Sequence, residues 1–470
     1  MTAIIKPHRF SGIIRVPASK SHTIRQLFIA SFADGVSELD HPLDSLDTRS
    51  CVSVCRALGA EITELRGRDP ASPNPMDEKG EKLLRWIVRG ITDPHNRAIH
   101  CDVGNSGTTL FLALAVAALG TGTVEFNGDE QIRRRSAGPL LNALAGLGIS
   151  VESAPSGCVP VSIRGPWKGG RVSLPCPTSQ YLSALLLAAP LAPGGVVTEI
   201  DVPLLNEKPY IEMTLSYLDA QEILYEAAQD LSYFRIPGGS TWNPMTGTIP
   251  ADFSSAAFPG AAAAITGGPV TLLGLDPNDT QGDKAFFDFL EKMGCSVEWE
   301  LVPVDRVSLG QFINPGLTAI GQKELELNIA EWQLTISRPD LLGGGEFDLN
   351  DTPDLLPALA AVACYAKGDT ALLNVAHARL KETDRITVMA KELGKLGVKT
   401  TERPDGLVIH GSGGIPHSPS YKTDGHSDHR VVMALACAAL GSARPVEITG
   451  AESSQVTYPG FLELLGAESV

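Results

Sequence analysis

The chain has 470 residues, of which 43% are hydrophobic and 20% are charged, and its formal net charge is −16. This length is more than one hydrophobic core usually holds, so we expect two domains. The composition is typical of a soluble globular protein and excludes a disordered chain. The acidic balance disfavours a nucleic-acid surface, because a phosphate backbone would be repelled on average, but it allows a local basic pocket for a small anion.

Eight cysteines occur without any Cys-x-x-Cys pair, and several lie in apolar runs, as Cys437 does. Such cysteines behave as small hydrophobic residues, so we expect reduced thiols rather than a disulfide framework. The first ten residues lack the apolar core of a signal peptide, and the longest apolar runs, such as residues 110–119, are too short to span a membrane. We therefore expect a cytoplasmic protein that does not insert into a membrane.

One pattern recurs along the chain: a polar start, an apolar run of helix length, a glycine or turn, and a β-rich stretch. In chain order the copies begin at Ser21, Ser106, Ser179, Ser254, Pro353 and Asp428. The runs are apolar nearly all round, as at residues 110–118 and 355–363, which predicts helices surrounded by a core. Two such matches could arise by chance, but six in fixed order indicate a true internal repeat.

A second element follows each copy: an amphipathic helix that ends in Leu-Gly or a near variant, usually with a strand behind it. In chain order the segments read VCRALGAEI, LLNALAGLGISV, EMTLSYLDAQEI, FLEKMGCSVEW, MAKELGKLGVKT and FLELLGAESV. The glycines stand where a helix C-cap favours positive φ, and the glycine-free residues 218–220 are the weakest match. The copies recur at roughly 75 residues. We therefore predict an α/β or α+β protein with three copies per domain.

Each buried helix is predicted to begin in a segment rich in Ser, Thr, Asp or Gly: SKSHT, GNSGTT, TSQ, DFSS, TPD and SDH. These residues cap helix N-termini, which by itself is a sufficient structural explanation. If the three helices of a domain run parallel, however, their positive ends converge on one face. Two such faces opposed across a cleft would attract anions despite the acidic net charge.

Basic residues cluster beside the predicted helix starts and strand ends: Lys20, Arg25, Arg135, Lys381, Arg385 and Arg430. Any one of them alone is more often a solvated surface charge, but their repeated placement favours a shared binding site. Arginine and lysine suit carboxylates and phosphates, so the predicted ligands are small, multiply charged anions. His377, His426 and His429 have no partners at metal-ligand spacing, and neither a P-loop nor a dinucleotide fingerprint occurs, so we predict no metal or nucleotide site.

Nine stretches, in the family's order, resemble the enolpyruvyl transferase family, and one of them, LKETDR, is typical of the branch that acts on shikimate 3-phosphate. They are PASKSHTIR (17–25), DSLDTRS (44–50), GNSGTT (104–109), RRRSAGPLLNAL (133–144), TSQYLSALLLAAPLA (178–192), EKPYIEMTL (207–215), QGDKAFFDFLEKMG (281–294), LKETDR (380–385) and SDHRVVMA (427–434). They cover nearly the whole chain. The sibling branch that uses a UDP-sugar has a loop cysteine where this chain has Glu130, which disfavours that alternative.

The resemblance implies a two-domain inside-out α/β barrel of six βαβαββ repeats, three per domain, with the active site in the interdomain cleft. It implies one domain formed by residues 1–18 plus 251–470 and another formed by residues 19–250. The implied activity transfers the carboxyvinyl group of phosphoenolpyruvate to the 5-hydroxyl of shikimate 3-phosphate and releases phosphate. The resemblance also implies a monomer that needs no metal and no organic cofactor.

Residue roles are carried over where this chain matches the family motifs, since the transfer requires an acid, a base and several cations. The implied catalytic residues are Asp354, which matches the carboxylate at the acceptor hydroxyl, and Glu382 and Lys20, which match groups for proton transfer. The implied phosphoenolpyruvate-binding residues are Lys20, Arg135, Gln180, Arg385 and Arg430. The implied acceptor-binding residues are Gln180 and Asp354, together with the residues that match the site of the acceptor's phosphate, namely Ser21, Arg25, Thr178, Ser179, Tyr210 and Lys381.

Three positions depart from the family pattern. Phe111 replaces an arginine, Val456 a lysine that contacts phosphoenolpyruvate, and Glu207 a small hydroxyl residue that helps to bind the acceptor's phosphate. At an effective dielectric constant of about 20, a carboxylate ~4 Å from a phosphate costs a few kcal/mol per charge pair. Either neighbouring basic groups such as Lys208 compensate, or the acceptor is another cyclic hydroxy acid without a phosphate. A non-catalytic anion-binding relative is the third alternative, and the retained catalytic residues disfavour it.

Overall fold

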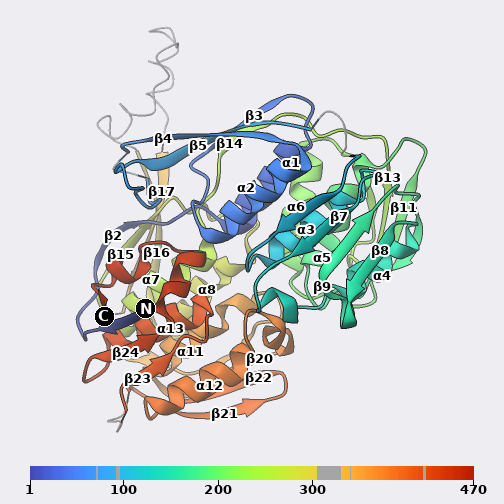
Figure 1. The fold of residues 1–470 in the computed structure, drawn as a ribbon. Helices are drawn as coiled ribbons and strands as arrows, with labels where there is room; N and C mark the ends of the chain where they lie inside the picture. Colours follow the sequence, from blue (N-terminus) through green and yellow to red (C-terminus); the bar gives the residue numbers. More distant parts are fainter. Residues whose placement is uncertain (70–71, 92–95, 304–329, 339, 416–419, 470) are drawn as a thin grey trace.

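The computed structural model describes the chain except for residues 70–71, 92–95, 304–329, 339, 416–419 and 470. The chain folds into two lobes, one drawn mainly in blue to green and the other mainly in yellow to red (Figure 1). The N-terminal strand is an exception, because it lies in the second lobe beside the C-terminus. Both lobes combine small sheets with helices, as the sequence predicts.

The first lobe contains three sheets and their helices. In chain order its elements are α1 (Lys20–Ser31), β3 (Val36–Asp40), α2 (Leu46–Leu58), β4 (Glu61–Gly67), β5 (Lys82–Arg89), β6 (Ile99–Asp102), α3 (Gly107–Ala117), β7 (Val124–Asn127), α4 (Gly138–Gly146), β8 (Ser150–Ala154), β9 (Cys158–Arg164), β10 (Gly170–Ser173), α5 (Gln180–Ala188), β11 (Val197–Asp201), α6 (Lys208–Ala220), β12 (Glu226–Ala227), β13 (Tyr233–Pro237) and β14 (Thr246–Thr248).

The second lobe contains the other three sheets. Its elements are β1 (Thr2–Ile5), β2 (Gly12–Arg15), α7 (Phe253–Thr266), β15 (Val270–Leu273), α8 (Ala285–Lys292), β16 (Ser296–Pro303), β17 (Ala330–Ser337), β18 (Leu342–Gly343), β19 (Glu346–Asp348), α11 (Leu356–Ala363), β20 (Ala366–Leu373), α12 (Arg385–Lys395), β21 (Lys399–Arg403), β22 (Gly406–Ser412), β23 (Lys422–Asp424), α13 (His429–Leu440), β24 (Val446–Thr449), α14 (Phe461–Leu464) and β25 (Glu468–Ser469).

The six sheets formed by the described residues share one strand order. In β6-β7-β9-β8 the first two strands run parallel, and the last strand of the unit inserts antiparallel between the second and the third. The same order holds in β10-β11-β13-β12, β14-β3-β5-β4, β2-β15-β17-β16, β23-β24-β1-β25 and β18-β20-β22-β21, where β19 also pairs with β20. The same βαβαββ unit therefore occurs six times, and the predicted repeat is confirmed.

Three sheets are completed by strands that are distant in sequence. β1 pairs with β24 and β2 pairs with β15, so both N-terminal strands belong to sheets of the second lobe. In the first lobe, β14 pairs with β3. The two crossings between the lobes run side by side. The Ser19 amide donates to the Pro250 carbonyl (2.7 Å), and the Asp252 amide donates to the Pro17 carbonyl (2.9 Å). The lobes are therefore joined by a double connection.

Each lobe has its own hydrophobic core around three buried helices. All eleven residues of α3 are buried, and α1 and α5 lie in the same core. Helices α7, α11 and α13 occupy the other core. The buried residues of the first core all fall within 18–249, and those of the second fall within 3–16 and 251–465. This distribution agrees to within one residue with the domain boundaries expected at 18/19 and 250/251, since Ala18 lies in the first core. The boundaries stay a prediction.

The helix ends follow the C-cap pattern read from the sequence. Gly59 ends α2 with φ 122°, and Gly294 follows α8 with φ 103°. In the third unit, which offers no glycine, Glu222 follows α6 with φ 55°. A non-glycine residue can adopt this conformation at some energetic cost. The weakest copy in the sequence is therefore a complete copy in the structure.

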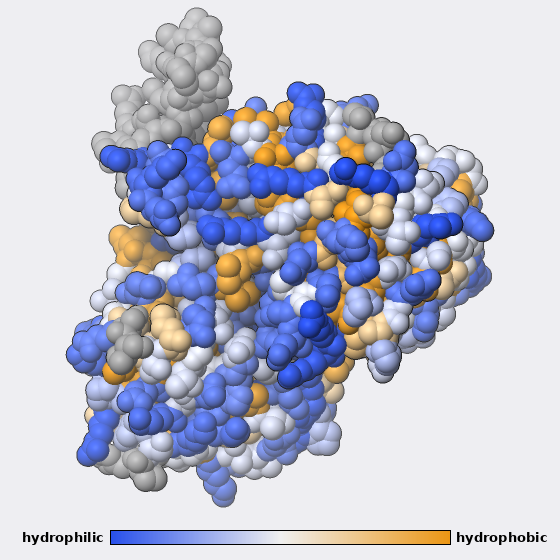
Figure 2. Space-filling model, in the orientation of Figure 1, coloured by the Kyte–Doolittle hydropathy of each residue, from blue (hydrophilic) through white to orange (hydrophobic). Residues whose placement is uncertain are grey.

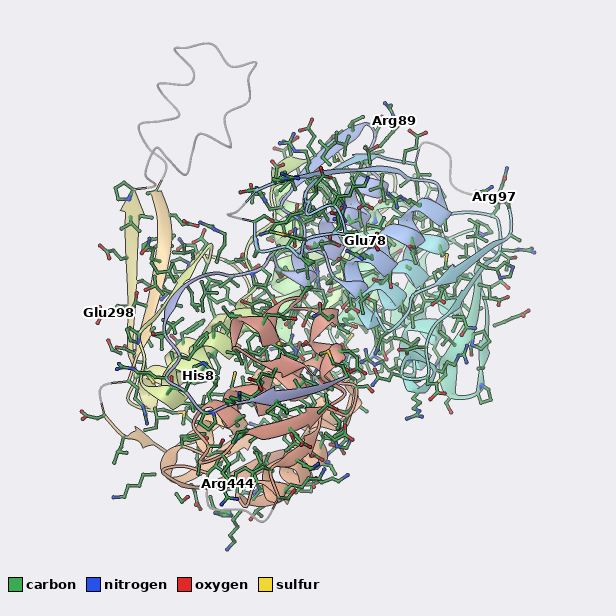
Figure 3. All side chains as sticks on the ribbon, turned by 60° about the vertical axis from the view of Figure 1, so that its left-hand side comes forward. His8, Glu78, Arg89, Arg97, Glu298 and Arg444 are labelled. Carbon is green, nitrogen blue, oxygen red and sulfur yellow. The ribbon has the colours of Figure 1, made fainter. Side chains whose placement is uncertain are left out.

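The face of the molecule shown in Figure 2 is mainly hydrophilic, with hydrophobic patches most visible in its upper part. Exposed charged residues such as Arg89, Glu298 and Arg444 lie at the periphery (Figure 3). All eight cysteines are described and unpaired, and seven of them are buried. Among the described residues, we find no helix with the length and hydrophobicity that crossing a membrane requires.

Candidate active site

A cavity of about 770 Å³ lies between the two lobes. The N-terminal ends of all six buried helices, or the turns just before them, reach it through Ser21, Thr108, Ser179, Ser254, Asp354 and Arg430. Seven lysines and arginines line the cavity against five aspartates and glutamates, so it is net positive in a chain whose net charge is −16. The predicted cleft of helix N-termini that attracts anions is therefore present.

Polar caps fix where these helices begin. Ser106 caps α3 and Asp252 caps α7, each by accepting a hydrogen bond from a backbone amide of the first turn. Asp428 caps α13 by accepting from the Arg430 amide (2.9 Å). Because a cap sets the first residue of a helix, it also sets where a neighbouring side chain such as Arg430 enters the cavity.

Arg385, the first residue of α12, is fully buried and holds three carboxylates together. Its guanidinium donates to Asp428 (Nε–Oδ2, 2.8 Å) and Glu382 (Nη2–Oε2, 2.6 Å). It also donates to Asp354 (Nη1–Oδ1, 2.7 Å). The planar guanidinium is suited to several such bonds at once. Arg385 does not line the cavity, so it lies behind the wall and orients Asp354 and Glu382, which do.

Asp354 precedes α11 and lies between cations. Its Oδ2 is 3.0 Å from Arg430 Nη2, and its Oδ1 is 3.6 Å from Lys381 Nζ. Burial alone would raise the pKa of Asp354, but Arg430, Lys381 and Arg385 hold it well below its ordinary value. The side chain is therefore an ionised carboxylate at neutral pH and can accept a proton.

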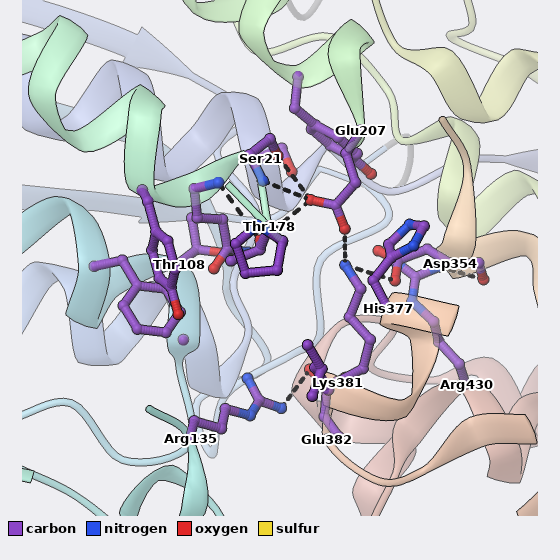
Figure 4. Close-up of a pocket in the computed structure, with 18 of the residues that line it drawn as sticks. Ser21, Thr108, Arg135, Thr178, Glu207, Asp354, His377, Lys381, Glu382 and Arg430 are labelled. Carbon is purple, nitrogen blue, oxygen red and sulfur yellow. Dashed lines mark hydrogen bonds and ion pairs between the residues drawn. The ribbon is translucent and has the colours of Figure 1, made fainter. Parts of the chain in front are cut away.

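Glu382 meets Arg135 across the cleft, with Oε1 3.0 Å from Nη2 (Figure 4). Burial alone would raise the pKa of Glu382, but Arg135 and Arg385 hold it well below its ordinary value. Nearby, burial lowers the pKa of His429 to about 3, so this imidazole is neutral. Two ionised carboxylates, Asp354 and Glu382, thus face the cavity from the second lobe.

Lys20, the first residue of α1, faces the cavity from the first lobe. Its Nζ lies 3.2 Å from Oδ2 of Asp47, a buried residue of α2. Burial raises the pKa of Asp47, and the charge of Lys20 opposes that rise. Because Lys20 lines the cavity between the lobes, this pair lies close to their meeting point.

Arg25 is 1% exposed, and its guanidinium is occupied by protein groups. It donates to Thr214 Oγ1 (2.9 Å), Ser183 Oγ (3.1 Å) and the Tyr210 carbonyl (3.3 Å). Burial lowers the pKa of Arg25 to about 10, so it is still charged at neutral pH. We call the part of the cavity lined by the predicted phosphate-site residues the acceptor end: Ser21, Arg25, Thr178, Ser179, Tyr210 and Lys381.

Glu207 occupies the acceptor end (Figure 4). Its Oε2 accepts hydrogen bonds from the Ser179 amide (3.0 Å), from Ser179 Oγ (2.8 Å) and from Thr178 Oγ1 (3.2 Å), and its Oε1 forms an ion pair with Lys381. Burial alone would raise the pKa of Glu207, but Lys381 lowers it. Lys208, which the sequence offers as the compensating cation, is exposed, so the compensation comes from Lys381.

The other two departures from the family pattern lie in different places. Phe111 lines the cavity and packs edge-on against Tyr181, with ring centroids 5.0 Å apart. Val456 lies outside this cavity, in a separate hollow shared with Glu452. Neither position provides a cation. Arg134 and Arg379 line the cavity and add positive charge that the sequence reasoning did not identify.

Twelve of the thirteen predicted site residues line the cavity: Lys20, Ser21, Arg25, Arg135, Thr178, Ser179, Gln180, Tyr210, Asp354, Lys381, Glu382 and Arg430. Arg385 is the exception. The sequence analysis did not identify Asp47, although it lies in one of the family-like stretches. It considered His377 only as a candidate metal ligand and rejected that role, although His377 stands four residues before Lys381. The part of the chain that the structure describes contains no group of three or more side chains suited to a metal.

Comparisons with known proteins identify the family of this chain. A family model described as EPSP synthase (3-phosphoshikimate 1-carboxyvinyltransferase) matches residues 4–465. A 3-phosphoshikimate 1-carboxyvinyltransferase of Acetivibrio thermocellus is 42% identical, over 98% of this chain and 96% of the relative, and one of Halorubrum lacusprofundi is 37% identical, over 97% and 94%. An EPSP synthase structure from Acinetobacter baumannii matches with a TM-score of 0.73 and 25% identity, over 99% of this chain and 97% of that one. This chain belongs to the EPSP synthase family.

Proposed function

We propose that this chain transfers the carboxyvinyl group of phosphoenolpyruvate to the 5-hydroxyl of shikimate 3-phosphate and releases phosphate, a step of the shikimate pathway of aromatic amino-acid biosynthesis. The observation that carries the proposal is that one net-positive cavity joins Asp354, Glu382 and Lys20 with arginines from both lobes. The names of relatives that match this chain over nearly its full length support the same activity.

In the proposed reaction the acceptor oxygen attacks C2 of phosphoenolpyruvate while C3 takes up a proton, which gives a tetrahedral ketal phosphate. The bond between C2 and the phosphate oxygen then breaks, phosphate leaves with the bonding electrons, and C3 loses a proton to restore the double bond. The acceptor oxygen has then replaced phosphate on C2. These steps need a base at the acceptor hydroxyl, a proton relay at C3 and cations around the donor.

Arg135, Arg430 and Lys20 bind the phosphate and carboxylate of phosphoenolpyruvate in this proposal. Arginines suit these groups because their forked donors match two oxygens at once. Arg135 belongs to the first lobe and Arg430 to the second, so the donor is held from both sides. Gln180 lies on the same wall, where its side-chain amide donates to Thr108 Oγ1 (3.1 Å). Arg385 acts through the carboxylates that it orients.

Asp354 accepts the proton of the acceptor hydroxyl, because it is an ionised carboxylate that lines the cavity. Lys20 and Glu382 serve the proton transfers at C3. When the anionic donor binds Arg135, it competes with Glu382 for that guanidinium. Loss of Arg135 as a cationic partner raises the pKa of Glu382. This carboxylate can then take up a proton and return it.

One observation favours a second candidate, in which the acceptor is another cyclic hydroxy acid that lacks the phosphate. Glu207 fills the acceptor end with a carboxylate of the protein itself. The third alternative, a non-catalytic relative that only binds anions, is disfavoured because the groups required for acid and base chemistry stand together in the cavity.

The test uses the purified chain, phosphoenolpyruvate and shikimate 3-phosphate, and measures phosphate release together with the mass of the carboxyvinyl product. In Asp354→Asn we expect kcat to fall by roughly 10²–10⁴-fold, the usual contribution of a general base. Asp340→Asn, at an exposed position, is the matched control and should leave kcat unchanged. Absence of phosphate release with shikimate 3-phosphate would contradict the proposal, and release with an unphosphorylated cyclic hydroxy acid alone would favour the second candidate.

We also propose an oligomeric state, a location and domain boundaries for this chain. The chain acts as a monomer in the cytoplasm on small-molecule substrates, through two domains divided at residues 18/19 and 250/251. The buried, unpaired thiols support the cytoplasmic location. The separate cores of the two lobes support the division into two domains. Light scattering after size exclusion, which measures the mass in solution, tests the oligomeric state.

A further inference from the structure

Glu207 is a buried carboxylate at the end of the cavity where the acceptor's phosphate is expected. Only 1% of the residue is exposed, and its backbone has φ 60° at the start of α6. A glutamate seldom adopts this left-handed conformation, because its Cβ crowds the backbone. Residues that keep such a conformation inside a cavity are often functional. The local fold thus presents this side chain to the acceptor end at some energetic cost.

The donors bound to Glu207 are the ones predicted to bind the phosphate. Ser179 gives it both the backbone amide and the hydroxyl, and makes no side-chain cap to its own helix α5. Thr178 and Lys381 complete the set. Arg25, the other cation at this end, directs its guanidinium to hydroxyls and carbonyls of the protein. The acceptor end therefore already contains an anion that uses its donors.

His377 adds an unsatisfied polar group beside them. It is 6% exposed and lines the cavity, and its Nε2 has no hydrogen-bond partner among the residues that the structure describes. Figure 4 shows the ring close to Asp354. Burial lowers the pKa of His377, so the ring is neutral at pH 7. A buried ring nitrogen without a partner is costly, and a ligand hydroxyl can satisfy it as donor or acceptor.

We propose that Glu207 takes the place of the acceptor's phosphate and determines acceptor specificity, so that shikimate, which carries a hydroxyl at that position, is also an acceptor for this chain. The inference rests on the proposed carboxyvinyl transfer and refines its acceptor. A phosphate that enters this end meets Glu207 as a like charge and must compete with it for Lys381 and Ser179. A hydroxyl can instead donate to Glu207 and pair with His377, and it leaves the existing bonds in place.

The experiment measures kcat/KM for shikimate 3-phosphate and for shikimate in the native chain, in Glu207→Ser and in Glu207→Gln. The glutamine keeps the size of the side chain and removes only its charge. We expect the ratio of the two values, phosphorylated over unphosphorylated, to rise by roughly 100-fold in both variants, as for removal of one close like-charge contact. A ratio that stays within about threefold of the native one overturns the proposal. A rise confined to Glu207→Ser also overturns it, because size would then set the preference.

Glu212→Ser is the matched control, since Glu212 is exposed on the same helix and should leave both constants unchanged. Melting curves establish that each variant is folded. Calorimetric binding of the two acceptors, with phosphoenolpyruvate present and absent, reports the same preference without turnover. If the native chain turns over neither acceptor, the proposed function fails, whereas the binding ratio still decides the role of Glu207.

Discussion

Arg135 and Glu382 lie 3.0 Å apart across the cleft, and each comes from a different lobe. The carboxylate is also held by Arg385 from behind, at 2.6 Å. In the proposed reaction, this ion pair links binding of the donor at Arg135 to the charge of Glu382. Because Arg135 is the cation that an incoming anion would share, the pair makes Glu382 responsive to the presence of substrate.

Glu382→Gln should therefore lose the proton relay at C3 and keep the shape of the site. We expect kcat to fall by roughly 10²–10⁴-fold. Turnover in D₂O followed by mass spectrometry provides a specific readout, since uptake of deuterium into the methylene group should fall together with the rate. Glu298→Gln, at the exposed position labelled in Figure 3, is the control. Undiminished deuterium uptake in Glu382→Gln would remove this residue from the relay.

Arg385→Lys should destabilise the protein, because lysine cannot reproduce the three bonds to Asp428, Glu382 and Asp354. Breaking such a buried network typically costs about 3–5 kcal/mol. Urea unfolding at pH 7 measures the loss, with Arg444→Lys at an exposed site as the control. An unchanged free energy of unfolding in Arg385→Lys would show that the network does not support the fold.

Asp283→Asn should make stability less dependent on pH. Burial, together with the charge of Asp354, raises the pKa of Asp283 to about 7, and its Oδ1 has no hydrogen-bond partner in the described part of the chain. Because the pKa of this carboxyl is higher in the folded than in the unfolded protein, its protonated form stabilises the fold. This stabilisation is complete below the unfolded-state pKa of 3.8 and is lost as pH rises through about 7. The stability of the asparagine variant relative to the native chain should therefore rise between pH 4.5 and pH 8, by at most roughly 3 kcal/mol. Urea unfolding at both pH values checks this, and a difference independent of pH would contradict it.

Asp47→Asn should impair Lys20 without unfolding the chain. Lys20 Nζ is held 3.2 Å from Asp47 Oδ2, so removal of the charge leaves the ammonium free to move. We expect kcat to fall by roughly tenfold or more, since small errors in the position of a reacting group are costly. Steady-state phosphate release measures the effect, and Asp219→Asn, which is exposed on α6, serves as control. A larger loss of stability than of rate would assign Asp47 to the fold instead.

The repeat could be predicted from the sequence because each copy carries its own local signals. The apolar run of α3 and the glycine that ends α2 need no knowledge of distant partners. Strand pairing is different, since β1 and β2 are four residues long and carry too little periodicity to show which sheet they join. Their partners β24 and β15 lie more than two hundred residues away.

At the site, sequence motifs predicted which residues gather but not how they are used. A motif does not distinguish an arginine that faces a ligand from one that faces carboxylates, and Arg385 is of the second kind. For Glu207 the sequence pointed to the adjacent Lys208 as the compensating charge. The residue that compensates is Lys381, 174 positions away in the chain and in the opposite lobe. Such contacts depend on the fold as a whole and cannot be predicted from residues adjacent in the sequence.

The membership of β1 and β2 in the second lobe bears on how this protein is made. β1 pairs with β25 as well as β24, which brings Ala3 opposite Ser469. During synthesis β2 must wait until β15 has left the ribosome, and β1 until β24 and β25 have left it, whereas the first lobe can form earlier. A circular permutant, with the old termini joined by a short linker and new ends opened between Ala18 and Ser19, would make each lobe one continuous stretch of chain. In that permutant the second lobe would no longer depend on the first residues to leave the ribosome.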